Sequence, residues 1–99
     1  MKSSIRRLVL DVLKPLKEPS IVDMARALAE LKGVSGVNIT VNDVDVETMG
    51  LIITIEGDDI DFEQVKRIIS DMGAVIHSVD QVIVGSKVVE TVYTPTTRQ

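Results

Sequence analysis

Apolar and polar residues alternate in four segments of the chain, the pattern of a β-strand with one buried face. In the first segment Leu8, Leu10 and Val12 share one face, and Pro15, which lacks a ladder donor, marks the end of the strand. Each later segment is bounded by glycine or by polar turn residues. The predicted strands are residues 4–13, 36–42, 51–56 and 79–84.

Two further segments repeat apolar residues at helical spacing. Ser20 and Asp61 are suitable N-caps, because each offers a side-chain oxygen to a free backbone N–H, and Gly33 and Gly73 suit the helix ends. We expect a first helix that ends near Lys32 and a second that begins after Asp61. Their predicted buried stripes are Ile21, Ala25, Leu28 and Leu31, and Phe62, Val65, Ile69 and Met72.

The resulting β-α-β-β-α-β order predicts an α+β, ferredoxin-like sandwich. In this fold the strands form one antiparallel sheet of order 4-1-3-2, and both helices cover the same face. We expect a single domain over residues 1–90 and a flexible C-terminal tail over 91–99. The stretch Lys87–Tyr93 is also a candidate for a short extra strand.

The helix-free face of the predicted sheet is mixed rather than polar. If Val79 and Ile83 of the last strand point inward, Val82 and Val84 join Val9 and Ile52 on the open face. Apolar groups of this size usually mark an interface. We therefore expect the chain to form a homo-oligomer.

Composition supports this expectation and excludes other classes. The chain has 99 residues, including 16 Val and 11 Ile but only one Phe, one Tyr and no Cys. About a third of the Val and Ile residues do not fit beneath two helices. The length suits one core, and the lack of cysteine excludes disulfides and thiolate metal sites. We predict a cytoplasmic protein, without a signal peptide or a membrane span.

Nucleic-acid binding and catalysis find little support. The net charge is −4, which opposes binding to phosphates, and the predicted central strands carry no aromatic residue on which bases could stack. No serine lies in a nucleophile-elbow sequence, and no paired acids flank an obvious cleft.

Acidic residues supply the candidate metal ligands, with Ca²⁺ as the cation that accepts many oxygen ligands. Asp11 and Asp80 are expected on neighbouring strands at one end of the open face. The predicted hairpin places Asp43, Asp45 and Glu47 at alternating positions. Solvated surface carboxylates are the alternative for both groups. A third acidic group, Asp58, Asp59 and Asp61, suits turn and cap positions.

Two other features have candidate chemistry. His77, the single histidine, cannot form a multi-histidine site within one chain, so we expect a packed or hydrogen-bonded turn residue. Lys14 and Lys17 precede the first helix and form the one candidate anion site, although Glu18 and Asp23 oppose it.

Several motifs together resemble an archaeal family catalogued as domain of unknown function 211. They are Arg7–Pro15, Gly36–Val41, Glu56-Gly57 with Ile60–Phe62, Ile76–Asp80 and Gly85, within a resemblance that covers about residues 5–89. The resemblance implies a ferredoxin-like fold and cyclic homo-oligomers. It implies no activity, substrate or catalytic residue.

Three functional hypotheses follow. The first is a non-catalytic module that forms a homo-oligomeric ring through its open face, an edge strand or both, and that binds calcium or another divalent cation. The second is an ACT-like regulatory domain that binds an amino acid or other small molecule at subunit interfaces, with the Gly33–Gly36 turn and Asn38 as candidates. The third is an enzyme with a metal-activated water at acidic side chains.

Overall fold

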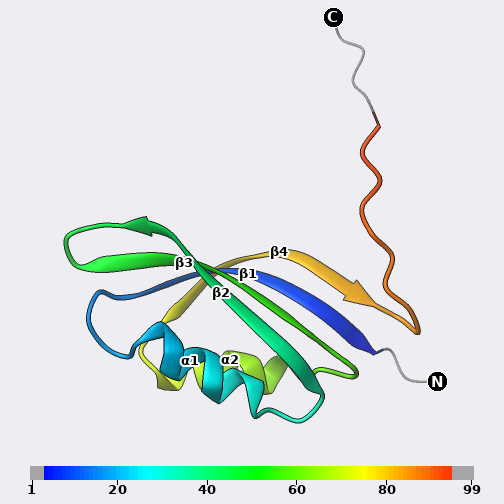
Figure 1. Ribbon diagram of the computed structural model, residues 1–99, viewed down its shortest axis with the longest axis horizontal. Helices are drawn as coiled ribbons and strands as arrows, with labels where there is room; N and C mark the ends of the chain where they lie inside the picture. Colours follow the sequence, from blue (N-terminus) through cyan, green and yellow to red (C-terminus); the bar gives the residue numbers. More distant parts are fainter. Residues whose placement is uncertain (1–3, 95–99) are drawn as a thin grey trace, which may run out of the picture.

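The computed structural model describes residues 4–94 and confirms the ferredoxin-like α+β fold. Its single sheet has four strands in the order β2-β3-β1-β4, and every neighbouring pair is antiparallel. Figure 1 shows both helices on the same face of the sheet. The elements are β1 (Ile5–Pro15), α1 (Ile21–Ala29), β2 (Val34–Val44), β3 (Thr48–Gly57), α2 (Phe62–Asp71) and β4 (Val75–Val84).

The core lies between the central strands and the helices. Leu8, Leu10 and Val12 of β1 face the helices as predicted, because alternate residues of a strand point to the same side. Register places them opposite Ile55, Ile53 and Leu51 of β3. The remaining core residues are Met24, Leu28, Ile60, Val65, Ile69 and Ala74.

Both predicted N-caps are confirmed. The Ser20 hydroxyl accepts from the backbone N–H of Asp23 at 3.0 Å, and the Asp61 carboxylate accepts from the N–H groups of Glu63 and Gln64 at 3.0 and 3.3 Å. Helix α1 ends at Ala29, earlier than predicted. A turn follows it, in which the N–H of Leu31 donates to the carbonyl of Leu28.

Strand β4 differs most from its prediction. It begins at Val75 rather than at residue 79, and its register with β1 shifts near His77 and again near Asp80. An extra residue in one strand of a pair breaks the period-two alternation on which the prediction depended. The prediction that Val79 and Ile83 share a face is therefore wrong, because Val79 pairs with Leu10 and Ile83 pairs with Arg7.

Loops meet at both ends of the sheet. At one end the N–H of Leu16 donates to the carbonyl of Glu47 at 3.0 Å, and at the other the N–H of Asp58 donates to the carbonyl of Gly33 at 2.8 Å. The second contact is so close that a Cβ on Gly57 would collide with the Gly33 carbonyl. These two glycines therefore join the start of β2 to the end of β3.

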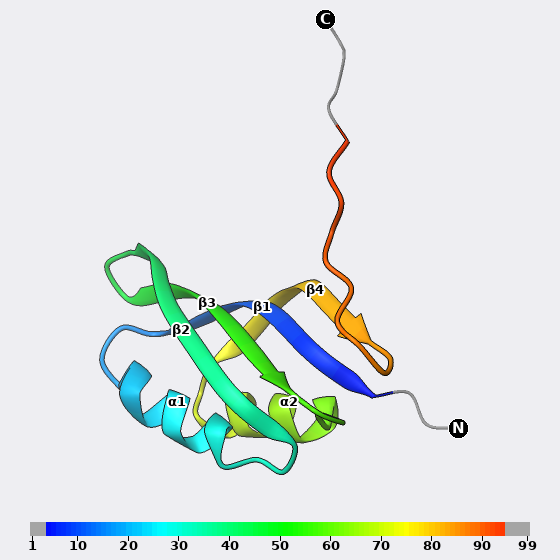
Figure 2. The same ribbon diagram turned by 45° about the vertical axis from the view of Figure 1, so that its right-hand side comes forward.

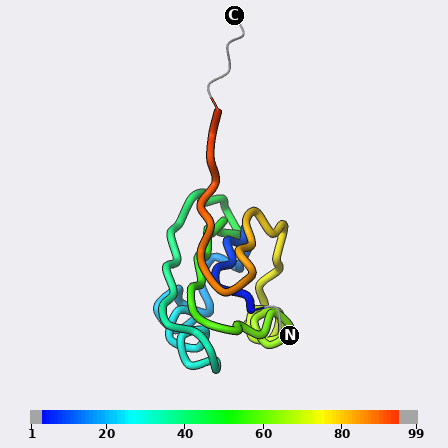
Figure 3. The backbone as a smooth tube through the Cα atoms, turned by 90° about the vertical axis from the view of Figure 1, so that its right-hand side faces the viewer, coloured from blue at the N-terminus to red at the C-terminus, as the bar shows by residue number. Residues whose placement is uncertain are grey.

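The C-terminal segment forms no strand within the described residues. After Gly85 the chain turns back over the end of the sheet and then extends away from the body (Figures 1 and 2). We call this segment, Lys87–Thr94, the arm. Figure 3 shows the arm rising on the side opposite the helices. The rest of the predicted tail, 95–99, lies outside the described residues. Neither helix in residues 4–94 is long and apolar enough to cross a membrane.

Candidate functional site

Exposed valines gather on the two edge strands, β2 and β4. On β4, Val75, Val79 and Val82 are 63%, 46% and 51% exposed. On β2, Val41 and Val44 are 39% and 58% exposed. Val79 and Val82 point to the helix side, opposite Leu10 and Leu8, yet neither helix covers them. An apolar strip on each edge is typical of a surface that contacts another molecule.

The open face of the sheet carries other apolar residues than the sequence predicted, since Val75 and Ile83 lie there opposite Leu13 and Arg7. Val9 and Ile52 do lie there, half-buried, opposite Thr54 and Asp11 of the neighbouring strand. Val82 does not, because residues directly opposite each other share a face and Val82 is opposite Leu8. The shifted register of β4 has moved Val82 from the predicted open face to the helix side.

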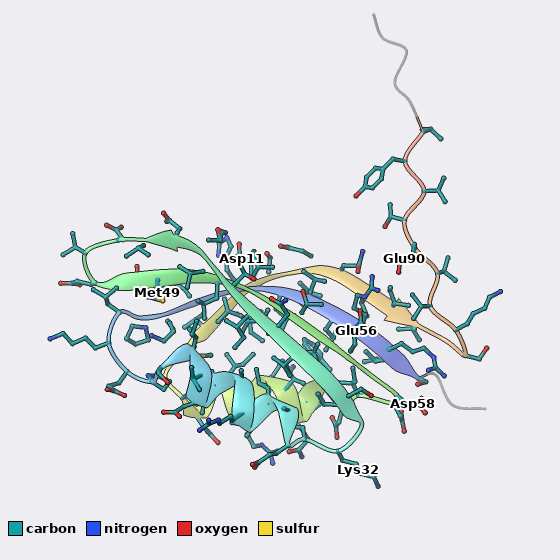
Figure 4. The ribbon with its side chains drawn as sticks, viewed as in Figure 1. Asp11, Lys32, Met49, Glu56, Asp58 and Glu90 are labelled. Atoms are coloured by element: carbon teal, nitrogen blue, oxygen red, sulfur yellow. The ribbon has the colours of Figure 1, made fainter. Side chains whose placement is uncertain are left out.

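The arm is fixed to the open face at its base. The Arg7 guanidinium donates to both carboxylate oxygens of Glu90 at 3.0 Å and to Glu56 Oε2 at 2.7 Å. Figure 4 labels Glu56 on β3 and Glu90 on the arm. The hydrogen bonds and charge of Arg7 hold the pKa of Glu90 below its ordinary value. The direction of the arm is therefore set by an ion-pair cluster.

A shallow hollow lies on the open face beside β2. It encloses about 330 Å³ and is lined by Gly36, Val37, Asn38, Thr54 and Glu56. Gly36 has no left-handed backbone, and within the described chain a Cβ added there would meet no atom within 4 Å. The hollow includes two of the predicted small-molecule candidates, Gly36 and Asn38.

Asp11 and Asp80 occupy neighbouring strands, but a β-bulge separates their registers. Asp11 lies opposite Ser78, on the open face, whereas Asp80 falls at the register shift of β4. The Ser78 hydroxyl donates to Asp80 Oδ1 at 2.7 Å. Within residues 4–94 no three Asp, Glu or His side chains converge as a metal-binding group. Calcium binding at Asp11 and Asp80 stays a prediction.

The hairpin acids Asp43, Asp45 and Glu47 are all exposed. Asp43 lies opposite Gly50 in the ladder, and Asp45 Oδ1 accepts from the backbone N–H of Val46 at 2.7 Å. The N–H of Asp45 also donates to the carbonyl of Thr48 at 2.8 Å. These bonds shape the β2–β3 turn, and a metal role for the three acids stays a prediction.

A larger hollow of about 890 Å³ lies between the end of α1 and the start of α2 and includes Gly33 and Phe62. Its acids already have intramolecular partners. Asp61 caps α2, and Asp58 Oδ1 accepts from the Ser4 hydroxyl at 2.9 Å and pairs with Arg6 at 3.5 Å. The predicted cap role of Asp61 is confirmed.

The lysine and histidine candidates are placed differently from their predictions. Lys14 is buried at 2% exposure, and its Nζ donates to the carbonyls of Pro15 and Leu16 at 2.6 and 3.4 Å. The lysine pair therefore does not form an anion site, since only Lys17 is exposed. His77 is exposed and lies within β4 at its first register shift, so, contrary to the prediction, it is neither packed nor in a turn.

Sequence reasoning missed the Arg7–Glu90 cluster. The two residues are 83 positions apart, and the predicted domain ended at the residue where the pairing occurs. The available signal was the β-branched composition of 88–92, which indicated an extended segment but not its contact with β1.

Comparison with known proteins agrees with the fold and the motifs. The family model DUF211, described as uncharacterized ArCR, matches residues 6–98. A relative from Methanocaldococcus jannaschii, uncharacterized protein MJ0319, is 49% identical over 96 residues, which are 97% of this chain and 98% of that protein. Both matches include the arm.

Proposed function

This chain belongs to the family of domain of unknown function 211, and we propose that it is a non-catalytic module that assembles with copies of itself into a closed ring. The observation that carries the proposal is the apolar strip on each edge strand. Val79 and Val82 line one edge, and Val41 and Val44 line the other. Unlike strips on opposite edges favour a contact between the β4 edge of one copy and the β2 edge of the next.

Such a head-to-tail contact leaves one free β2 edge and one free β4 edge on every growing assembly. A ring removes both free edges once the rotation between copies closes. Closure also protects the sheet from uncontrolled pairing, because an exposed edge strand presents unpaired backbone groups. The proposed assembly therefore accounts for two long uncovered edges in a chain of this size.

Substitution at the β4 edge tests the proposal. Val82→Glu places a charge in the contact and is expected to shift the protein from an oligomer to a monomer, measured by light scattering coupled to sizing. Val22→Glu is the matched control, because Val22 is 55% exposed on α1 and belongs to neither edge strand. A wild-type protein that is already monomeric contradicts the proposal.

The proposal also includes the binding of a divalent cation at Asp11 and Asp80. Calcium takes six to eight oxygen ligands, more than Asp11 and Asp80 supply, so water or a second copy must complete the shell. The test is thermal unfolding with and without millimolar Ca²⁺, using Asp11→Asn as the binding-deficient variant. Equal melting temperatures at all calcium concentrations contradict the cation hypothesis and leave the assembly untouched.

An ACT-like role is the second candidate, and the hollow at Gly36 and Asn38 is the observation that favours it. An amino acid bound there would lie on the open face and, in an assembly, near a neighbouring copy. A panel of amino acids in a thermal-shift assay tests this role, with Asn38→Ala as the variant expected to lose the response.

We place the protein in the cytoplasm, since the chain has no cysteine.

A further inference from the structure

The arm has the properties of a segment that binds elsewhere. Val92 and Tyr93 are 85% and 87% exposed, although two hydrogen bonds from the Arg7 guanidinium hold the arm at Glu90. Beyond the ion pair the described arm consists of Thr91, Val92, Tyr93 and Thr94, of which three are β-branched. A fixed base with an exposed apolar tip lowers the ordering cost of binding, since part of the conformational freedom is already lost.

The base of the arm already covers one part of a sheet. Ile83 is only 6% exposed although it lies outside the main core, on the open face beside Arg7. Because Arg7 binds Glu90, the arm passes over this row of its own sheet before it extends away. The same row continues through Glu56 to Gly36 on β2, where the hollow stays open in the single chain.

Gly36 follows a register shift at the start of β2, between the Val34–Gly57 and Gly36–Glu56 pairs. Gly33 and Gly57 are explained by the close approach of their loops, but nothing approaches the Gly36 Cβ position. A glycine inside a strand often marks such a bulge, and the open space above Gly36 also leaves room for a ligand or another chain. The side chains beside it, Asn38, Thr54 and Glu56, offer polar atoms to a hydroxyl group.

The reach of the arm fits the proposed contact between edges. Tyr93 lies three positions after Glu90, so an extended chain carries it about 10 Å from the anchor. Strands lie roughly 4.8 Å apart, so about 10 Å from β1 reaches either β2 of the same chain, across β3, or a strand that adjoins β4. Tyr93 is 87% exposed and does not fill the hollow of its own chain. In the proposed ring the adjoining strand is β2 of the next copy, which carries Gly36.

We infer that the arm of one copy docks on the open sheet face of the next copy, with the Tyr93 ring in the hollow above Gly36. The apolar ring covers the glycine, and its hydroxyl meets the polar lining of the hollow. The inference rests on the proposed function and names the segment and the receptor site of the assembly. The partner at this hollow is thus a second copy of the chain.

Site-specific cross-linking tests the inference, because the chain contains no cysteine. Two single variants, Thr94→Cys and Asn38→Cys, are coexpressed and treated with a short bismaleimide. A cross-linked dimer between the two variants is expected. Thr94→Cys with Val22→Cys, on α1, is the control pair and is expected to give background only.

The same cross-linking assay tests the role of Tyr93, with the cross-linked dimer detected as a gel band. Tyr93→Ala in the Thr94→Cys chain is expected to abolish the cross-link, whereas Thr91→Ala, on the same arm, is expected to retain it. A band that survives Tyr93→Ala overturns the assignment of the hollow to Tyr93.

The remaining outcomes separate the two proposals. An oligomeric wild type that gives no Thr94–Asn38 product, or an equal product with Val22, overturns the arm inference and leaves the ring intact. A monomeric wild type without any product overturns both.

Discussion

The central and edge strands of this sheet use similar residues for different purposes. On β1 and β3, the helix-facing side chains Leu10, Val12 and Ile53 are fully buried. On β4, Val79 and Val82 face the same side but remain about half exposed. The difference lies in coverage by the helices, which is decided by packing and not by residue type. An apolar residue on an inward-facing position therefore indicates burial only where a second layer lies over it.

The largest expected effect separates buried from exposed apolar residues. Ile53→Ala removes a fully buried side chain from the central strand and is expected to lower the free energy of unfolding by about 2–5 kcal/mol. Val79→Ala is expected to change it little in dilute protein, and more as the concentration rises, because its contacts are made in the assembly. Urea unfolding at two protein concentrations measures both. If Ile53→Ala and Val79→Ala lower the free energy of unfolding equally at low protein concentration, the distinction between central and edge strands is contradicted.

Alanine substitutions at two glycines, Gly57 on β3 and Gly36 on the edge strand β2, are expected to change the free energy of unfolding less. Gly57→Ala forces a Cβ into the Gly33 carbonyl at the junction of β2 and β3, and overpacking of this kind costs roughly 1–3 kcal/mol. Gly36→Ala meets open space in the single chain and is expected to stabilise the strand by roughly 0.5–1 kcal/mol. Urea unfolding of both variants, made in a Val82→Glu background, compares the monomers. A destabilising Gly36→Ala there contradicts the open position described for this residue.

The smallest effect concerns the anchor of the arm. The pKa of Glu90 is lowered in the folded chain by its hydrogen bonds to Arg7. A lowered pKa means that the carboxylate stabilises the folded arm above the ordinary pKa of glutamate, 4.5, and that this stabilisation is lost as the pH falls through the lowered value. NMR titration of the Glu90 carboxyl carbon measures the shift, and Arg7→Gln is expected to return the midpoint to its ordinary range. An unchanged midpoint in that variant contradicts the anchor.

The sequence was sufficient for the regular parts of the fold. Period-two alternation identified the inward face of β1, and the oxygen side chains of Ser20 and Asp61 identified both helix starts. These features depend on local spacing and local hydrogen bonds, which the sequence contains directly.

The irregular parts were not available from spacing. The register shifts of β4 at His77 and Asp80 moved Val82 to the other face. Period-two alternation does not predict where an extra residue enters a strand. Lys14 was predicted as part of an anion site with Lys17, but its long stem allows Nζ to reach two backbone carbonyls from a buried position. The bond between Arg7 and Glu90 depends on the path of the chain after Gly85, which no local pattern records.

Assembly through unlike edges is the central claim, and mixing two edge variants tests it most directly. Val44→Glu damages the β2 edge and Val82→Glu damages the β4 edge, so each variant alone is expected to be monomeric by light scattering. Mixed in equal amounts, they retain one intact β4 edge and one intact β2 edge, and we predict a one-to-one heterodimer that grows no further. A Val44→Glu protein that remains oligomeric alone, or a mixture that stays monomeric, would contradict a contact between the β4 edge of one copy and the β2 edge of the next.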